Sequence, residues 1–409
     1  MIHRKRSVST RLGHALDDFG QEDPSDPRVS TPRGRYWRDE FRRRLPSDPT
    51  DEPEDACAGL SRVTVRIIHA GLGGWGSDWA RTAIPAVSAV EVVAVVDPHV
   101  PTLESVAADI GIPADRTFGS LSPALEAVDA DAVVITSPVA THVPLALTAL
   151  EAGKHVLVEK PLANTMEEAR IAAVRAEELG LILQVSQNYR NYPAPRAVRE
   201  LLKSGILGEL AAINIDFRKW DNDEPVETHR HYAFPHPMIN DMAIHHFDLL
   251  RMITGKEAVS VFAKAGDPSF SKYVEEASAV MTIEMEDGLV VSYRGSWISR
   301  GRETPWAGEW SIEGEAGELF FTSRAGGGDE DASGDVVTIR RPGRVRAVKV
   351  PLEYAKLYDR SAGLEIFARA VTDGPPPEST GRENLGSLAL MEAAARSASS
   401  GGVEAVHRP

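Results

Sequence analysis

The chain has 409 residues, and its 45 Lys and Arg against 60 Asp and Glu give a formal net charge of -15. This charge would repel a polyanion, so nucleic acid is not expected as a partner and a small molecule is favoured. No apolar run has the length and flanks of a membrane-spanning helix or a signal peptide, so neither a membrane nor export is expected. The single cysteine, Cys57, has no partner for an internal disulfide, which favours a cytoplasmic location.

The first part of the chain differs in composition from the rest. Residues 1–60 are rich in Arg, Asp, Pro and Ser and poor in aliphatic side chains. Such a segment buries too little apolar surface to offset the entropy lost on ordering, so we predict a disordered N-terminal extension. The β-branched run that begins at Val63 predicts the first strand of a folded domain.

Short apolar runs alternate with helix-length amphipathic segments over residues 62–186. The runs are apolar at consecutive positions, which is typical of strands that are covered on both faces. The segments between them carry apolar residues at helical spacing and end in glycine, which suits a helix C-cap. This alternation predicts an α/β domain of the Rossmann type with a doubly wound parallel sheet.

The pattern changes after about residue 208. Strand-like segments then follow one another over hairpin turns, and one long helical segment, around 240–254, comes between them. Two further helical stretches close the chain. We therefore predict that residues 187–409 form an α+β domain with a mainly antiparallel open sheet.

The first predicted strand runs into a glycine-rich turn, residues 71–76, that fits the pattern G-x-G-x-x-G. Gly71 permits the tight turn, Gly73 lets the backbone approach a pyrophosphate, and Gly76 lets the helix pack closely on the strand. Asp97 ends the next apolar run, where a carboxylate can bind ribose hydroxyls and repel a 2′-phosphate. The pattern therefore predicts NAD, with NADP disfavoured, although Asp97 before proline could also start a turn.

Lys160 follows another apolar run, which places it at the carboxyl end of a strand and on the crevice side of the sheet. Its ammonium group could bind a reacting hydroxyl and stabilise the negative charge that develops as the proton leaves. Partial burial would lower its pKa. The alternative is a surface lysine in a strand-to-helix turn.

Asp241 and His245 lie four residues apart in an apolar helical segment and hence on one helical face. The imidazole could take the hydroxyl proton while hydride leaves the same carbon, with Asp241 orienting the ring or stabilising its charged form. An Asp and a His that only satisfy each other in the core are one alternative. A metal site built from His245, His246 and Asp248 is another, but His246 faces a different side and no further ligand pattern accompanies it, so no metal is expected.

With these motifs in order, the chain resembles the Gfo/Idh/MocA family, the glucose-fructose oxidoreductase and inositol dehydrogenase group, over residues 63–405. The resemblance rests on GLGGWG, VVDP, TSPVATH, EAGKHVLVEKPLA, QNYRNYP, DMAIHHFDLL and LALMEAAARSASSGG. It implies that Lys160, Asp241 and His245 carry catalysis and that the Lys160–Pro161 peptide bond is cis. It also implies that the second domain binds substrate and forms homodimers or homotetramers through its open sheet.

The motifs together give two sets of predicted site residues. The cofactor set is Gly71, Gly73, Gly74, Trp75, Gly76, Asp97, Thr136, Ser137, Pro138, His142, Glu159 and Lys160. The substrate set is Lys160, Tyr189, Arg190, Trp220, His231, His236, Asp241 and His245. The family's usual glycine run before D-x-x-x-H is replaced here by residues 235–240, so the substrate cannot be carried over by analogy.

These features predict an NAD-dependent dehydrogenase that moves hydride between the nicotinamide and a hydroxyl of a sugar, inositol or glycoside. Two alternatives stay open. The first is an NAD-binding, sugar-sensing regulator on the same fold. The second is an enzyme that recycles a tightly held NAD, as in oxidation of a glycoside before elimination.

Overall fold

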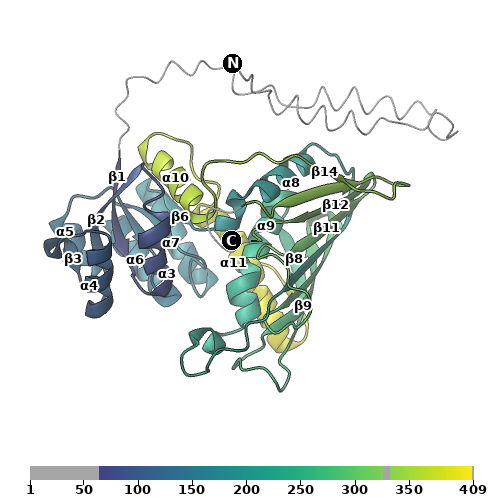
Figure 1. Ribbon diagram of the computed structural model, residues 1–409, viewed down its shortest axis with the longest axis horizontal. Coiled ribbons are helices and arrows are strands. Elements are labelled where there is room, and N and C mark those ends of the chain that lie inside the picture. Colours follow the sequence, from purple (N-terminus) through teal and green to yellow (C-terminus); the bar gives the residue numbers. More distant parts are fainter. Residues whose placement is uncertain (1–63, 326–331, 408–409) are drawn as a thin grey trace, which may run out of the picture.

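The computed structural model of the chain describes residues 64–325 and 332–407, which form two sheets with their helices (Figure 1). The extension predicted to be disordered, residues 1–60, lies outside the described residues. No helix in the described ranges is long and apolar enough to cross a membrane. The two sheets correspond to the two folded regions that the sequence predicts.

Within the described residues, the first sheet has six parallel strands in the order β3-β2-β1-β4-β5-β6. They are β1 (Val65–Ala70), β2 (Val90–Val96), β3 (Thr117–Phe118), β4 (Ala132–Ile135), β5 (His155–Val158) and β6 (Leu183–Val185). The helices are α3 (Gly74–Asp78), α4 (Val100–Asp109), α5 (Leu121–Ala127), α6 (His142–Glu151) and α7 (Met166–Leu179). The strand order reverses between β1 and β4, which is where open α/β sheets form their ligand crevice. The predicted doubly wound sheet is confirmed.

Both faces of the first sheet are covered, as the consecutive apolar positions predict. Ile68 of β1 points into the main core, while its neighbour Ile67 packs on the opposite face with Phe367. Phe367 belongs to α10 (Asp359–Thr372), so a helix from near the end of the chain completes the N-terminal layer. Packing in the N-terminal domain thus includes a helix from beyond the predicted boundary after residue 186.

The second sheet, as far as the described residues extend, has nine strands in the order β14-β13-β12-β11-β7-β10-β9-β8-β15. Only β7 and β10 pair in parallel, so the predicted mainly antiparallel sheet is confirmed. The strands are β7 (Leu210–Arg218), β8 (Ala258–Gly266), β9 (Ser278–Met285), β10 (Val290–Ser296), β11 (Glu309–Gly314), β12 (Gly317–Thr322), β13 (Val336–Arg340), β14 (Val348–Lys349) and β15 (Val403–Ala405).

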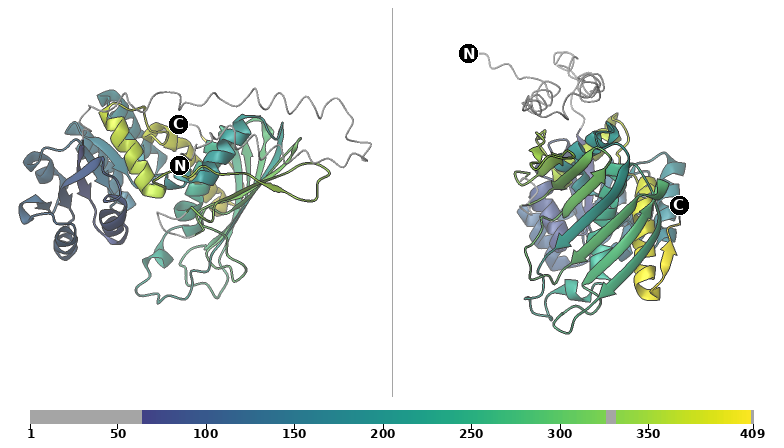
Figure 2. Two further views of the ribbon diagram at one scale, coloured as in Figure 1. Left: turned by 45° about the horizontal axis from the view of Figure 1, so that its top comes forward. Right: turned by 90° about the vertical axis from the view of Figure 1, so that its right-hand side faces the viewer.

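The second sheet has one covered and one open face. Along β9, Met281 and Ile283 are buried whereas Val280 and Glu284 are exposed, which is the alternation of a sheet with one solvated face. The covering helices are α8 (Pro193–Lys203), α9 (Ile244–Thr254) and α11 (Gly381–Ser400). The right-hand view of Figure 2 looks onto the open face, with the helices behind it or at its edge.

The long helix expected around 240–254 starts slightly earlier and is not regular throughout. A π-helical segment, Met238–Ala243, continues directly into α9. Every residue of α9 except Thr254 is buried, and Gly255 ends the helix with φ +65°. Asp241 thus lies in the π-helical segment and His245 in the first turn of α9, and π-helical segments of this kind are frequent at functional sites.

Candidate active site

The glycine-rich turn after β1 has the close contacts that its sequence predicts. Gly71 has φ +94°, and a Cβ there would lie 2.4 Å from the backbone nitrogen of Ser137. A Cβ at Gly76 would lie 1.9 Å from the carbonyl oxygen of Gly71, so α3 can approach β1 only without a side chain. A Cβ at Gly73 or Gly74 would meet nothing within 4 Å among the described residues. The middle of the turn therefore borders open space.

Asp97 lies at the carboxyl end of β2, beside this turn. Its Oδ2 accepts a hydrogen bond from the backbone N–H of Leu72 at 2.6 Å, and its Oδ1 accepts one from the backbone N–H of His99 at 2.8 Å. The bond to His99 closes the local turn that the alternative interpretation of Asp97 predicts. The bond to Leu72 holds the same carboxylate against the glycine-rich turn. Asp97 therefore makes the local turn contact and also borders the predicted cofactor site.

The residues after β4 hold the loops of the crevice together. The Thr136 hydroxyl donates to the carbonyl of Gly71 at 2.5 Å. The His142 ring is buried between two carbonyl oxygens, with Nε2 2.8 Å from that of Ser137 and Nδ1 2.8 Å from that of Pro161. Ser137 is only partly buried and Pro138 is exposed, so these two residues are the ones that remain accessible to a ligand.

Glu159 ties the glycine-rich turn to the strand end that carries Lys160. Its Oε1 accepts hydrogen bonds from the indole N–H groups of Trp75, at 3.0 Å, and Trp79, at 2.8 Å. Its Oε2 accepts from the backbone N–H of Lys160 at 3.0 Å. Trp79 is buried, whereas Trp75 is 46% exposed and has the Arg360 guanidinium 4.2 Å from the centre of its ring.

Lys160 reaches from the end of β5 to the π-helical segment. Its Nζ donates to the Oδ1 and to the backbone carbonyl of Asp241, both at 2.9 Å, and the Lys160–Pro161 peptide bond is cis, as expected. Burial opposes the charge of the ammonium, but the neighbouring carboxylate outweighs it and raises the pKa of Lys160. The expectation of a lowered pKa is therefore wrong, because it left out Asp241.

His231 extends this ion pair on the other side of Asp241. Its Nε2 lies 3.3 Å from the Oδ2 of Asp241, and its Nδ1 lies 2.9 Å from the Oδ2 of Asp221. Burial opposes a charge on the ring, but the two carboxylates raise the pKa of His231 to about 9. Burial also opposes ionisation of Asp241, yet Lys160 and His231 draw its pKa well below the usual range. Asp241 is thus a carboxylate held between two cations.

His245 is buried against an aromatic ring. It stacks on Tyr189 with ring centroids 4.1 Å apart and planes 6° apart, and among the described residues its Nδ1 has no hydrogen-bond partner. Burial lowers the pKa of His245 well below 6.5, and the charges of Lys160 and Arg324 lower it further, so the ring is neutral near pH 6.5. The expectation that Asp241 orients His245 is corrected, because the Asp241 carboxylate is bound to Lys160 and His231 instead.

Two residues that the sequence analysis did not single out fix Tyr189. Arg324 donates to the Tyr189 hydroxyl at 2.8 Å and lies 4.8 Å from the centre of its ring. Asp359, at the start of α10, accepts from the Arg324 guanidinium at 3.1 Å. Both residues have positive φ, of +61° and +52°, and both lie far along the chain from the motifs. Their sequence neighbourhoods carry no signal that would have revealed this role.

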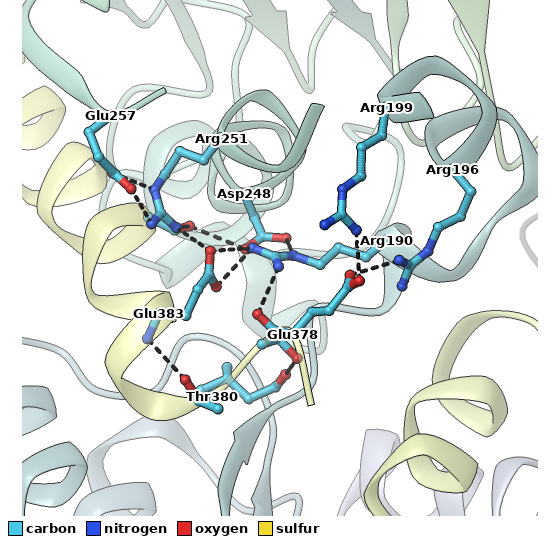
Figure 3. A network of polar contacts seen from close by, with 12 residues as sticks. Arg190, Arg196, Arg199, Asp248, Arg251, Glu257, Glu378, Thr380 and Glu383 are labelled. Atoms are coloured by element: carbon cyan, nitrogen blue, oxygen red, sulfur yellow. Dashed lines mark hydrogen bonds and ion pairs between the residues drawn. The ribbon is translucent and has the colours of Figure 1, made fainter. Parts of the chain in front are cut away.

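Arg190 lies in a buried network of ion pairs (Figure 3). Its guanidinium donates to both oxygens of Asp248, at 2.5 and 2.7 Å, and to Glu383 at 2.9 Å. Arg251 joins the network through Glu383 and Glu257. The side chains of Arg190 and Asp248 are 5% and 2% exposed. These contacts argue against the predicted substrate contact of Arg190, because its charge is already committed to two carboxylates.

The other predicted substrate contacts have partners of their own. The Trp220 indole donates to Asp223 at 2.7 Å, and the His236 Nδ1 lies 3.1 Å from Glu276. Their contact with a substrate stays a prediction. His246 faces Tyr293 at 3.0 Å while Asp248 binds Arg190, so the residues of the disfavoured metal interpretation are separately engaged.

Comparison with known families agrees with the fold. A family model described as oxidoreductase family, NAD-binding Rossmann fold, matches residues 65–187, and the GFO/IDH/MocA C-terminal domain model matches residues 195–320. The two domains define an oxidoreductase with a Rossmann domain for NAD. The chain belongs to the Gfo/Idh/MocA family, as its motifs predicted.

Among similar proteins, the inositol 2-dehydrogenase of Rhizobium meliloti strain 1021 is 29% identical over 346 residues, which are 82% of this chain and 97% of that protein. An oxidoreductase from Agrobacterium radiobacter, solved with NAD+, L-tartaric acid and magnesium, has a TM-score of 0.70 at 21% identity, over 84% of this chain and 98% of that one. The aldose-aldose oxidoreductase from Caulobacter crescentus, complexed with glycerol, has a TM-score of 0.72 at 19% identity, over 84% and 99%. At these identities the two structures support the fold.

Proposed function

We propose that this oxidoreductase transfers hydride between a ring hydroxyl carbon of a sugar, inositol or glycoside and NAD, with Lys160, Asp241 and His245 as its catalytic residues. The observation that carries this proposal is that the Lys160 ammonium stays protonated while the imidazole of His245 stays neutral in the same site. Lys160 is held cationic by Asp241, while His245 is held neutral by burial and by the charge of Lys160 itself. A cation bound to Asp241 and a neutral base one helical turn further along the chain suit the removal of a hydroxyl proton.

The open space beside Gly73 in the glycine-rich turn is consistent with a bound dinucleotide. Gly71 and Gly76 are needed for the packing of the protein itself, whereas a Cβ at Gly73 would be tolerated by the described residues. Close approach of a bound pyrophosphate is a reason for glycine there. Trp75, Ser137 and Pro138 would border the same molecule. Bound NAD would supply the acceptor for hydride.

We propose NAD rather than NADP on the basis of Asp97. Its carboxylate stands at the end of β2 and is held against the glycine-rich turn by Leu72. A 2′-phosphate placed beside this carboxylate would be repelled, whereas ribose hydroxyls could donate to it. Calorimetric titration with both dinucleotides tests this point, and at least tenfold tighter binding of NAD is expected.

The proton chemistry follows from the charges around the site. The Lys160 ammonium would donate a hydrogen bond to the substrate oxygen and stabilise it as charge develops, and Asp241 keeps that ammonium protonated and in position. His245 would take the proton, since its neutral ring is the only form that can accept one. Tyr189 limits the ring to one plane through the stacking contact.

A substrate panel tests the proposed reaction. Purified full-length protein is mixed with NAD and, in turn, inositols, aldoses and glycosides, and the absorbance of reduced nicotinamide is followed. The name of the similar inositol 2-dehydrogenase is the reason to place inositols first. Reduction with at least one polyol is expected. No reduction across the panel, together with no detectable binding of NAD, would overturn the proposal.

The same preparation separates the two alternatives. A nicotinamide absorbance that is present before any cofactor is added, and that survives gel filtration, would indicate a tightly held cofactor that is recycled. A protein that binds both NAD and sugar without turnover would indicate a regulator. The paired Lys160 and Asp241 favour an enzyme, because sensing alone does not require a lysine kept charged beside a neutral base.

We also propose that the open face of the second sheet joins copies of this chain as a homodimer or homotetramer. Val259, Val280 and Val290 are exposed apolar side chains on strands of this sheet, and they support the idea. Light scattering coupled to gel filtration measures the assembly. A cytoplasmic location is proposed from the single cysteine of the sequence.

A further inference from the structure

A compact group of possible metal ligands lies beside the catalytic residues but is not part of them. We call it the Asp221 cluster, and its members are Asp221, His229, His231 and Tyr273. Three of them come from the segment that follows β7, and Tyr273 comes from the connection between β8 and β9. The side chains of the carboxylate and the two histidines are between 20% and 28% exposed, so the cluster is recessed but reachable by a small ion.

The ligand atoms converge on one point. The Asp221 Oδ2 lies 3.1 Å from the His229 Nε2, 2.9 Å from the His231 Nδ1 and 2.6 Å from the Tyr273 hydroxyl. The Tyr273 hydroxyl is also 3.1 Å from the His231 Nδ1. Bonds of about 2.0–2.1 Å to a tetrahedral ion put neighbouring ligand atoms roughly 3.3 Å apart. Outward shifts of a few tenths of an ångström to about 0.7 Å would therefore bring each contact of the Asp221 Oδ2 to the separation found in a four-coordinate site, and the three potential ligands all lie within 4.8 Å of one another.

Two further observations favour an ion over a purely hydrogen-bonded cluster. Among the residues that the structure describes, the ion-pair partners of Asp221 are His229 and His231, which are themselves potential metal ligands. In addition, the Nε2 of His231 lies 3.3 Å from the Oδ2 of Asp241, close to but outside hydrogen-bond geometry, so a small rotation of the ring would complete this bond. Histidines that bind a metal through one nitrogen almost always donate from the other to a carboxylate or carbonyl, which fixes the ring.

We propose that the Asp221 cluster binds a divalent transition-metal ion, with zinc as the best fit to its two imidazoles and carboxylate and with the Tyr273 hydroxyl or a water molecule in the fourth position. Two nitrogen ligands disfavour magnesium and calcium, which prefer oxygen throughout. The bound ion would connect Tyr273 to the segment after β7. It would replace the Nδ1 proton of His231, so the positive charge beside Asp241 would come from the ion instead of from that proton. The inference concerns metal binding alone, and it stands or falls independently of the proposed reaction.

The chain provides a matched control. His236, Glu275 and Glu276 form another group of three potential ligands, with side chains between 23% and 42% exposed. This group contains a single nitrogen ligand, and the contacts of its histidine do not include a carboxylate on the opposite ring nitrogen. It is expected to bind no ion tightly.

Metal binding is measured on the full chain with its affinity tag removed. The protein is stripped with a chelator and titrated with Zn²⁺ under calorimetry, and with Co²⁺ while visible absorption is followed. One equivalent of metal and the intense bands of four-coordinate cobalt are expected. His229→Ala and Asp221→Asn should each weaken zinc binding at least a hundredfold, while His236→Ala should leave it unchanged. Circular dichroism of each variant checks that it is folded.

Three results would overturn the inference. The first is the absence of stoichiometric zinc or cobalt binding by the folded wild-type chain. The second is binding that His229→Ala and Asp221→Asn leave intact, which would indicate an adventitious ion only. The third is cobalt absorption typical of six water-like ligands. Because none of these readouts uses turnover, failure here is distinguishable from failure of the proposed reaction.

Discussion

The ring of His245 lies parallel to the ring of Tyr189, with centroids 4.1 Å apart, and Arg324 fixes the Tyr189 hydroxyl from the other side. This contact places the neutral imidazole without using any hydrogen bond to Nδ1. Tyr189→Leu should therefore lower kcat about tenfold to a hundredfold, since loss of orientation is costly in a catalytic group. Tyr189→Phe keeps the stack and should lower kcat less than fivefold or so. Equal losses in both variants would show that the hydroxyl, not the ring, matters.

The ion pair between Lys160 and Asp241 predicts that substitution of either residue lowers kcat/KM by a similar, large factor. Lys160→Met and Asp241→Asn should each lower kcat/KM by about 10² to 10⁴, because the first removes the cation held at the substrate oxygen and the second removes the carboxylate that holds this cation in position. The double variant should be little worse than either single one, since the two residues act as a unit. Multiplicative losses in steady-state kinetics would contradict that coupling.

The pH dependence of oxidation should report the neutral state of His245. Burial and the nearby cations lower the pKa of His245 well below 6.5, so the basic form persists as pH falls through 6.5. The acid limb of kcat/KM is therefore expected below that pH, and not at the value of an ordinary histidine. A midpoint at or above 6.5 that His245→Asn abolishes would show that the ring is not shielded as the structure indicates.

Stability should also fall in acid for a separate reason. Burial lowers the pKa of His69 and of His246 from 6.5 to about 4, so the unfolded chain binds these protons first as pH falls. The free energy of unfolding should thus decrease between pH 6.5 and 4, by at most about 1.4 kcal/mol per pH unit for each ring. Urea titrations across this window measure the slope. A flat profile would be inconsistent with two buried neutral histidines.

The network around Arg190 is predicted to stabilise the fold. Arg190→Ala leaves Asp248 buried without its partner and should cost about 3–5 kcal/mol of unfolding free energy. The neighbouring surface pair offers a control, since Arg196→Ala removes a contact between partly exposed groups and should cost no more than about 1 kcal/mol. Denaturant melts of both variants provide the comparison, and similar costs would contradict the assignment.

The fold was predictable because its signals are local. Consecutive apolar positions indicated a sheet that is covered on both faces, and the glycine pattern at 71–76 indicated the crevice. The same reasoning placed Lys160 and His245 in one site. It also named His231 as a candidate contact, although not its place between two carboxylates.

The rest depended on contacts between distant segments. Arg324 binds Tyr189 from a segment far along the chain, Asp359 holds Arg324 from the start of α10, and no periodicity in the sequence indicates either contact. The pKa of Lys160 moved opposite to the sequence-based expectation because the partner that raises it lies 81 residues away. Arg190 was predicted to bind substrate, but in the folded chain it forms ion pairs with Asp248 and Glu383, which are distant in the sequence.

The central claim is that Lys160 and His245 act together on one substrate hydroxyl beside bound NAD. The most direct test measures NAD reduction by the wild-type chain, Lys160→Met and His245→Asn with a polyol from the substrate panel, alongside calorimetric binding of NAD to each. The account predicts that both variants lose at least a hundredfold in kcat while their affinity for NAD changes less than about threefold. Turnover that survives in either variant, with NAD bound and the fold intact, would contradict it.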